Sequence, residues 1–166
     1  MKILIATGIF PPDIGGPATY VPFLAEECVR RGHAIRVVTY SARMFVDTPY
    51  PVSHIPRLLL PIRYFLFCLA CVRYGFSADV IFEQDASSSG IPASCAAFLL
   101  RKRFICKIVG DFSWEYARNK GLADDSIDEF EQHGSYPFVI ALIRFFQKAV
   151  CWYAERIIVP SVYLKE

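Results

Sequence analysis

The chain begins with MKILIATGIFPPDIGG, residues 1–16, in which a short apolar run leads into a loop that ends on two adjacent glycines. The run Lys2–Ala6 (KILIA) is typical of a strand covered on both faces by helices. The two consecutive prolines of the loop exclude a helix or a regular strand there. Gly15 and Gly16 precede Pro17, and proline is favoured at the first position of a helix. The segment therefore predicts a βα unit whose helix N-terminus can bind an anion.

The alternation of apolar strand and helix continues along the chain. Further strands are predicted at Ala34–Tyr40, Val52–Ile55, Asp79–Glu83, Phe104–Val109 and Arg156–Pro160. Helices are predicted at Pro17–Arg31, Pro61–Tyr74, Ser87–Arg101 and Tyr136–Ala154. The polar positions of the last helix form a narrow stripe, so we expect that helix to be mostly buried. This order predicts an α/β fold, a doubly wound Rossmann-like parallel sheet in a three-layer α/β/α arrangement.

The bulk composition limits the class of protein. A length of 166 residues predicts a single domain, 1–166, and 54% hydrophobic with 20% charged residues excludes disorder. The formal net charge is only +2, and there is no basic block, so we expect no nucleic-acid partner. Because Met1 and Lys2 lead directly into the first strand, we also expect no signal peptide.

The cysteines and histidines do not form a metal-site pattern. Six cysteines are scattered along the chain, and only Cys68 and Cys71 make a C-x-x-C pair, inside an apolar segment. The three histidines are isolated from one another. Reduced, buried cysteines in a cytoplasmic protein are therefore favoured over a zinc site or disulfides, and no metal is expected.

One acidic segment, Asn119–Ser135, interrupts the strand–helix rhythm. The favoured interpretation is a solvated loop with a half-turn of helix. The alternative is a mobile lid, because long loops in compact α/β domains often have a function.

Three predicted loops end at the carboxyl edge of the sheet, where ligands bind in doubly wound folds. They are residues 8–16, 84–90 and 110–114. These loops, together with residue 115 directly after the third one, contain the candidate site residues. They are Asp13, Gly15, Gly16, Gln84, Asp85, Ser87–Ser89, Asp111, Trp114 and Glu115. Asp85, Ser87 or Asp111 could instead simply cap a helix or shape a turn. The convergence of the three loops favours a site.

Two common nucleotide-binding motifs are absent from the sequence. A nicotinamide-dependent dehydrogenase needs G-x-G-x-x-G directly after the first strand, but Gly8 is followed by Ile-Phe-Pro-Pro, and no acidic residue ends the second strand. No G-K-[ST] sequence of a P-loop occurs either.

Four segments resemble the amino-terminal half of GT-B glycosyltransferases of family 4. They are the F-P-P-x-x-G-G-x-x-x-Y pattern of Phe10–Tyr20, AEECVRRGHAIRVVT (25–39), KIVGDFSWEYARNKG (107–121) with DSIDEF (125–130), and AERIIVPSVYLKE (154–166). The third is similar to a subgroup that builds polysaccharides. The resemblance spans essentially the whole chain.

This resemblance implies a retaining hexosyltransferase that uses a nucleotide-sugar donor, UDP- or GDP-linked, without a metal. Gly15 and Gly16 would let the backbone approach the donor phosphates, with Tyr20 on the same wall. Asp111 would be catalytic and contact the reacting hydroxyls, while Trp114 and Glu115 would shape the acceptor pocket. Asp13, Gln84 and Asp85 are expected to bind substrate as well.

Two positions depart from the family pattern. Many members have a histidine where this chain has Gly110, and many have H-x-H where this chain has Glu83, Gln84 and Asp85. No histidine role carries over to either place.

The donor-binding domain of the family, with its E-x7-E motif, is expected to lie outside these 166 residues, in the same or a separate chain. The expected function is the acceptor side of sugar transfer in polysaccharide or glycolipid synthesis, with a glycan or lipid-linked acceptor. The domain alone is expected to be inactive, because transfer needs donor and acceptor in one cleft. The alternative is a non-catalytic Rossmann-like binding or assembly module that works with a partner chain.

The segment Arg57–Phe76 has two interpretations. A crossover helix on the sheet is favoured, because its charges form no broad polar face. The alternative is an interfacial helix on anionic lipid, which would make the protein peripheral to the inner face of the membrane. Its longest apolar run, Tyr64–Val72, is far shorter than the roughly 20 residues of a spanning helix.

Overall fold

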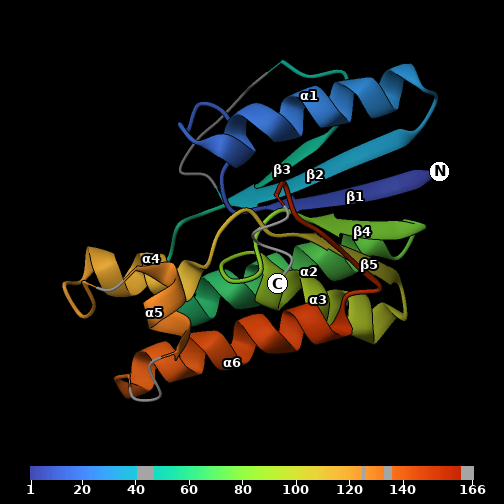
Figure 1. Ribbon diagram of the computed structural model, residues 1–166. Coiled ribbons are helices and arrows are strands. Elements are labelled where there is room, and N and C mark those ends of the chain that lie inside the picture. Colours follow the sequence, from blue (N-terminus) through green and yellow to red (C-terminus); the bar gives the residue numbers. More distant parts are fainter. Residues whose placement is uncertain (41–46, 125, 133–135, 162–166) are drawn as a thin grey trace.

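The computed structural model (Figure 1) describes residues 1–40, 47–124, 126–132 and 136–161. Six parallel strands form one sheet in the order β3-β2-β1-β4-β5-β6. The order reverses between β1 and β4, which is the switch point of a doubly wound fold. The strands are β1 (Lys2–Thr7), β2 (Ala34–Tyr40), β3 (Val52–Ile55), β4 (Val80–Glu83), β5 (Arg103–Lys107) and β6 (Arg156–Ile158). All six predicted strands are confirmed, with small shifts at their ends.

Helices cover both faces of the sheet, as predicted. One face is covered by α1, the other by α2, α3 and α6, while α4 and α5 lie near the carboxyl ends of the strands (Figure 1). The helices are α1 (Gly16–Arg30), α2 (Leu60–Gly75), α3 (Gly90–Leu100), α4 (Phe112–Asn119), α5 (Ile127–Gln132) and α6 (Phe138–Tyr153). None of the described helices is long and apolar enough to cross a bilayer.

The core is divided by the sheet into two layers. Phe10 and Val21 pack with Ile5 on the α1 side. Phe67 and Phe104 pack on the opposite side, beneath α2 and α3. β1 and β4 are central strands, and their near-continuous apolar sequences follow from burial on both faces.

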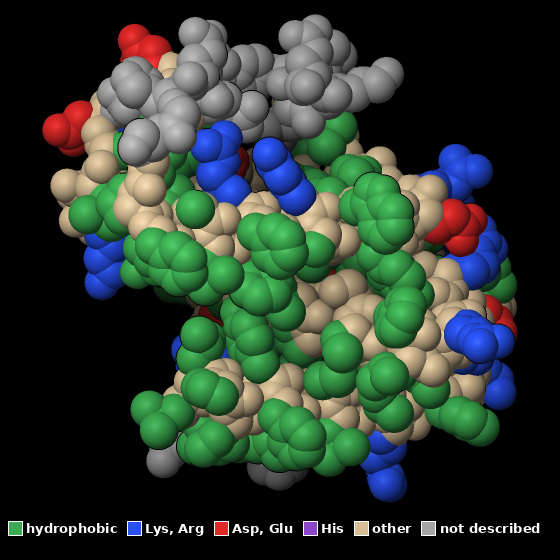
Figure 2. All heavy atoms as spheres, turned by 90° about the horizontal axis from the view of Figure 1, so that it is seen from below, with side chains coloured by type: hydrophobic (Ala, Val, Ile, Leu, Met, Phe, Trp, Pro, Cys, Tyr) green, Lys and Arg blue, Asp and Glu red, His purple; other side chains and the backbone are tan. Residues whose placement is uncertain are grey.

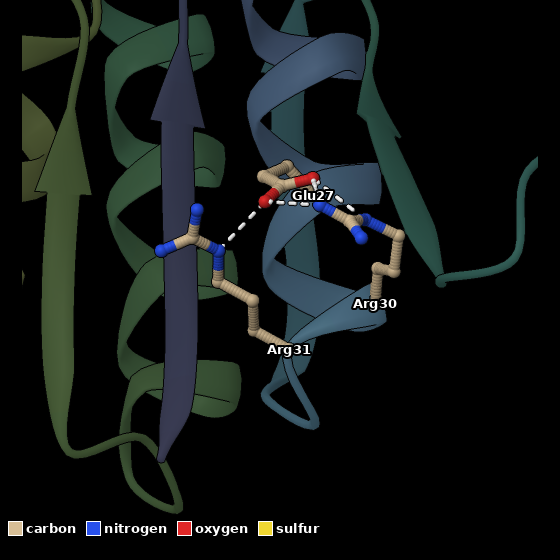
Figure 3. Close-up of polar contacts among 3 residues, drawn as sticks. All are labelled: Glu27, Arg30 and Arg31. Carbon is tan, nitrogen blue, oxygen red and sulfur yellow. Dashed lines mark hydrogen bonds and ion pairs between the residues drawn. The ribbon is translucent and has the colours of Figure 1, made fainter.

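The two ends of α1 show why glycine precedes and follows it. Gly15 has φ 157° and ψ 170°, a backbone conformation that is essentially restricted to glycine. Gly32, just beyond the helix, has φ 81°. In the last turns Glu27 accepts hydrogen bonds from both Arg30 and Arg31 (Figure 3), and these bonds lower the pKa of its carboxyl. The pairs are exposed, so they add little to stability.

The prediction of a solvated loop with a half-turn of helix at 119–135 is confirmed for residues 120–124, which form no helix or strand and are mostly exposed, but it is wrong for residues 127–132. Residues 127–132 form α5, a longer helix than the half-turn expected, and Phe130 is fully buried against Ala117 and Ile140. A further short helix, α4, was not predicted at all. Residues 125 and 133–135 of this segment lie outside the described residues, as do residues 162–166 of the family-like carboxy-terminal motif.

The expectation that the last long helix is mostly buried is also wrong. In α6 only Ile140 and Val150 are buried, whereas Phe138, Phe145 and Trp152 are largely exposed. By contrast, α2 is the crossover helix that was favoured for its segment, because it packs Phe67 and Cys71 against the sheet.

Candidate functional site

A cleft of about 380 Å³ lies at the carboxyl ends of β1, β4 and β5. Its position at the strand-order switch point is where ligands bind in doubly wound sheets. The three loops that were predicted to converge all contribute to its wall. The lining residues are Gly8, Ile9, Gly16, Pro17, Gln84, Asp85, Ala86, Ser88, Ile108, Val109, Gly110, Phe112, Glu115 and Gln147.

Gln84 supplies the clearest chemical signal in the cleft. Its backbone N–H donates to the Ala6 carbonyl at 3.2 Å, which fixes the residue just beyond β4. The residue is only 1% exposed, and its Nε2 has no hydrogen-bond partner among the described residues. Buried amides are normally satisfied. Gln84 therefore combines a place in the cleft wall with a buried amide donor that the described residues leave unsatisfied.

Asp85 organises the loop between β4 and α3. Its Oδ1 accepts from the backbone N–H of Ser87 at 3.0 Å and from the Ser87 hydroxyl at 2.6 Å. Its Oδ2 accepts from the backbone N–H of Ser88 at 2.8 Å and from the Ser88 hydroxyl. Both oxygens are therefore engaged within the loop. Asp85 therefore shapes the turn before α3, the role considered for it as an alternative to ligand binding. It also lies in the cleft wall.

Two glycines allow this loop to pack closely. A Cβ on Gly8 would lie 2.6 Å from the Ser88 hydroxyl oxygen, so the loop after β1 passes directly over the loop after β4. A Cβ on Gly90 would lie 2.4 Å from the Asp85 carbonyl oxygen. Contacts this short do not occur for real side chains. The clash at Gly90 is with backbone, so that position requires glycine, whereas a side chain at position 8 would force the Ser88 hydroxyl to move away from Asp85.

Glu83 supports the same loop from below and is fully buried. It accepts hydrogen bonds from the backbone N–H of Asp85 at 2.6 Å, the Ser89 hydroxyl at 2.8 Å and the Cys106 thiol at 3.2 Å. Burial, and then the negative charge of Asp85, raise the pKa of the Glu83 carboxyl well above its ordinary value. Glu83 therefore anchors the loop, and its burial beneath the cleft favours the uncharged form of the carboxyl.

The third loop of the cleft wall follows β5 and leads into α4. Asp111 is the N-cap of α4: its Oδ1 accepts from the backbone N–H of Ser113 at 2.7 Å and from that of Trp114 at 3.4 Å. The cap aims the first turn of α4 so that Glu115 reaches the cleft. The Glu115 side chain is exposed, yet partial desolvation, followed by the charges of Asp85 and Asp111, raises the pKa of its carboxyl.

The cleft brings together some of the predicted site residues and not others. Gly16, Gln84, Asp85, Ser88 and Glu115 are in its wall. Ser87 and Ser89 belong to the same loop without lining it, and five further predicted residues also lie outside the lining. They are Gly15, which directly precedes Gly16; Asp13, which pairs with Arg57; Tyr20, whose ring lies 3.1 Å from Lys107 Nζ; Asp111, which caps α4; and Trp114, which packs toward Ala117 and Phe130.

Sequence reasoning missed several lining residues. Gln147 reaches the cleft from α6, and its place in the narrow polar stripe of that helix was a signal that could have identified it. Ile9, Ile108 and Phe112 form apolar parts of the wall. Nothing in the sequence separated them from ordinary core positions, because apolar residues are expected throughout a buried sheet.

The charge of the cleft limits its ligand. Among the described lining residues the only ionisable side chains are Asp85 and Glu115, and no lysine or arginine is present. The described residues also contain no group of three or more His, Cys, Asp or Glu placed to hold a metal ion. Carboxylates and amides beside apolar surface suit a neutral ligand with several hydroxyls better than a polyanion.

A scan against protein-family profiles gave no match, and neither did a search of curated proteins. Solved structures are similar in fold. UDP-GlcNAc 2-epimerase from Methanocaldococcus jannaschii superposes with a TM-score of 0.62 at 10% identity, over 97% of this chain and 40% of that protein. The same enzyme from Neisseria meningitidis, bound to UDP-GlcNAc, gives 0.55 at 13% identity, over 90% and 38%.

An alpha-glucosyltransferase in complex with UDP and DNA is similar as well, with a TM-score of 0.56 at 10% identity, over 98% of this chain and 37% of that protein. The chain therefore spans about two-fifths of the length of these proteins. At these identities the likeness concerns the fold alone. The chain has the α/β Rossmann-like fold of one half of a GT-B protein.

Proposed function

We propose that this chain is the acceptor-side half of a retaining, metal-independent hexosyltransferase that transfers sugar from a UDP- or GDP-sugar in polysaccharide or glycolipid synthesis. The donor-binding half is a second Rossmann-like domain, in the same or another chain. The UDP and UDP-GlcNAc named for the structural neighbours support a nucleotide sugar as the co-substrate.

The observation that carries the proposal is the chemistry of the cleft wall. Gln84 has a buried amide donor that no described residue satisfies, Glu115 offers a carboxyl of raised pKa, and no cation lies among the described lining residues. Sugar hydroxyls both donate and accept hydrogen bonds, so they match this combination of groups. A diphosphate needs cations or free backbone N–H groups, and the N-terminus of α1, at Gly16 and Pro17, is the helix end in this wall that suits an anion.

Roles for the remaining residues follow from this assignment. Gly15 and Gly16 allow the donor phosphates to approach the N-terminus of α1. Asp111 acts on the reacting acceptor hydroxyl through the carboxylate oxygen that its cap does not use, since all three capping bonds go to Oδ1. Glu115 and Gln84 hold neighbouring hydroxyls. Trp114 stabilises the wall by packing against Phe130 of α5. Tyr20 does so through the contact of its ring with Lys107.

Sugar transfer by a completed enzyme tests the proposal. The purified chain is expected to give no turnover with radiolabelled UDP-glucose or GDP-mannose and a panel of methyl glycosides, because donor and acceptor must share one closed cleft. Fusing a GT-B donor domain to the carboxy-terminal end is expected to produce transfer. Asp111→Asn and Glu115→Gln should each lower that transfer by roughly 10²-fold or more.

The matched control is Lys120→Gln, which changes an exposed residue at the C-terminal end of α4 that does not line the cleft. Turnover by the isolated chain would contradict the proposal. Transfer by the fusion that is unaffected by Asp111→Asn and by Glu115→Gln would instead favour a non-catalytic assembly module.

A further inference from the structure

Three helices, α2, α3 and α6, form a continuous layer on one side of the sheet (Figure 1). α3 packs against both of the other two, and the ring of Phe98 on α3 meets that of Tyr153 on α6 with centroids 5.9 Å apart. The outer surface of this layer is largely hydrophobic, as Figure 2 shows. We call this surface the three-helix face.

The exposed apolar residues of the three-helix face follow helical spacing. On α6 they recur every three, four or seven residues, and on α2 in the same way, so each set makes one outward stripe. Phe138 is 81% exposed and Trp152 is 90% exposed. The residues of the face are Ile62, Phe65, Leu69, Phe98, Leu99, Phe138, Leu142, Phe145 and Trp152. A contiguous apolar surface of this kind marks an interaction site.

The charged side chains of the three helices are all basic. No aspartate or glutamate occurs in α2, α3 or α6, which carry Arg63, Arg73, Arg144 and Lys148. The whole chain has nearly balanced charges, 18 basic against 16 acidic residues. The three helices therefore differ from the chain as a whole in carrying basic residues alone. Within the described residues, the exposed Arg73 and Lys148 make no ion pair.

We propose that the three-helix face docks on the surface of an anionic lipid bilayer, with the helices lying in the interface. Phenylalanine, leucine and tryptophan side chains enter the boundary between headgroups and acyl chains, and lysines and arginines bind the anionic headgroups. An apolar protein partner would cover the stripes equally well, but it would not call for helices devoid of acidic residues. The proposal is independent of the function assigned to the cleft.

Vesicle flotation of the purified chain tests the proposal. We expect the chain to float with vesicles of phosphatidylcholine and phosphatidylglycerol, and to bind pure phosphatidylcholine at least about tenfold more weakly. The triple variant Phe65→Ser/Phe145→Ser/Trp152→Ser should lose binding to both. Arg73→Glu/Lys148→Glu should lower binding to the anionic vesicles by at least about tenfold, and added salt should do the same to the parent chain.

Matched controls lie on the opposite side of the sheet. Ile14 is 99% exposed and Phe23 on α1 is 72% exposed, so Ile14→Ser/Phe23→Ser removes apolar surface away from the face. Arg30→Glu/Arg31→Glu reverses two charges on and just after α1 (Figure 3). Both controls should bind like the parent, and thermal unfolding should show that all variants are folded. Equal binding to neutral and anionic vesicles, or a parent that self-associates without binding lipid, would overturn the proposal.

Discussion

At the scale of single residues, the cleft depends on a carboxyl that lies outside it. Glu83 holds the β4–α3 loop through the backbone N–H of Asp85 and the Ser89 hydroxyl, and both bonds end on its Oε1. Glutamine keeps that acceptor and has no proton to lose. Glu83→Gln therefore separates the geometry of the loop from the ionisation of the carboxyl beneath it.

The free energy of unfolding should show this ionisation directly. The folded state raises the pKa of Glu83 above 4.5, so it binds the proton more tightly than the unfolded chain does. The parent must then lose stability as the pH rises from about 4.5 toward the folded pKa, whereas Glu83→Gln does not. We expect the stability of the variant relative to the parent to increase between about pH 5 and pH 8 in urea unfolding.

Glu155→Gln is the control for that experiment. Hydrogen bonds and the charge of Arg103 lower the pKa of Glu155. The contribution of Glu155 to the free energy of unfolding therefore changes only at acid pH. Its stability difference from the parent should stay flat across the same range. A flat difference for Glu83→Gln as well would mean that the carboxyl is not held neutral in the fold.

Glycine packing in the same loop makes a second prediction. A Cβ on Gly90 would collide with the Asp85 carbonyl, whereas one on Gly16 would meet no atom within 4 Å. We expect Gly90→Ala to lower the free energy of unfolding by roughly 1–3 kcal/mol. Gly16→Ala should leave it unchanged or raise it by up to about 1 kcal/mol. Equal free energies of unfolding for the two variants in chemical denaturation would contradict the close packing at Gly90.

At the scale of secondary-structure elements, α6 shows what sequence periodicity leaves undecided. Its narrow polar stripe indicated burial, but the neighbouring elements cover only the side that carries Ile140 and Val150. Whether an apolar face is covered depends on the neighbouring elements, and that information is not local. By contrast, α4 did carry a usable signal, because an aspartate N-cap such as Asp111 commonly starts a helix.

Two substitutions in α6 distinguish its packed side from its open side. Ile140→Ala removes a fully buried side chain and should lower the free energy of unfolding by about 2–5 kcal/mol. Phe138→Ala, on the same helix, removes a larger but exposed side chain and should change it by less than about 0.5 kcal/mol. A large cost for Phe138→Ala would show that another surface covers this helix in solution.

At the scale of the whole molecule, the parallel, doubly wound sheet was predicted from the sequence, whereas its strand order was not, and the residues of the cleft were predicted only in part. Continuous apolar runs such as Lys2–Ala6 predicted parallel strands, and the parallel arrangement brought the three loops to one edge. The pairing of Asp13 with Arg57, and of Tyr20 with Lys107, joins residues far apart in sequence. Such contacts arise only once the register and loop paths are set.

The claim that the cleft binds sugar hydroxyls is tested most directly by NMR titration of the labelled chain with methyl glycosides. We predict saturable shifts of the Gln84 side-chain amide and of the backbone N–H groups of Gly16 and Gly110. Gln84→Met should abolish them while leaving the chain at least as stable, because the substitution removes a buried donor that has no partner in the described part of the chain.

A second cavity, of about 390 Å³, serves as an internal control, because it lies at the opposite edge of the sheet around His33 and Tyr74. Saturable shifts that map to the cleft and disappear in Gln84→Met would support the acceptor site. Shifts confined to the opposite edge, or shifts at the cleft that persist in Gln84→Met, would contradict it.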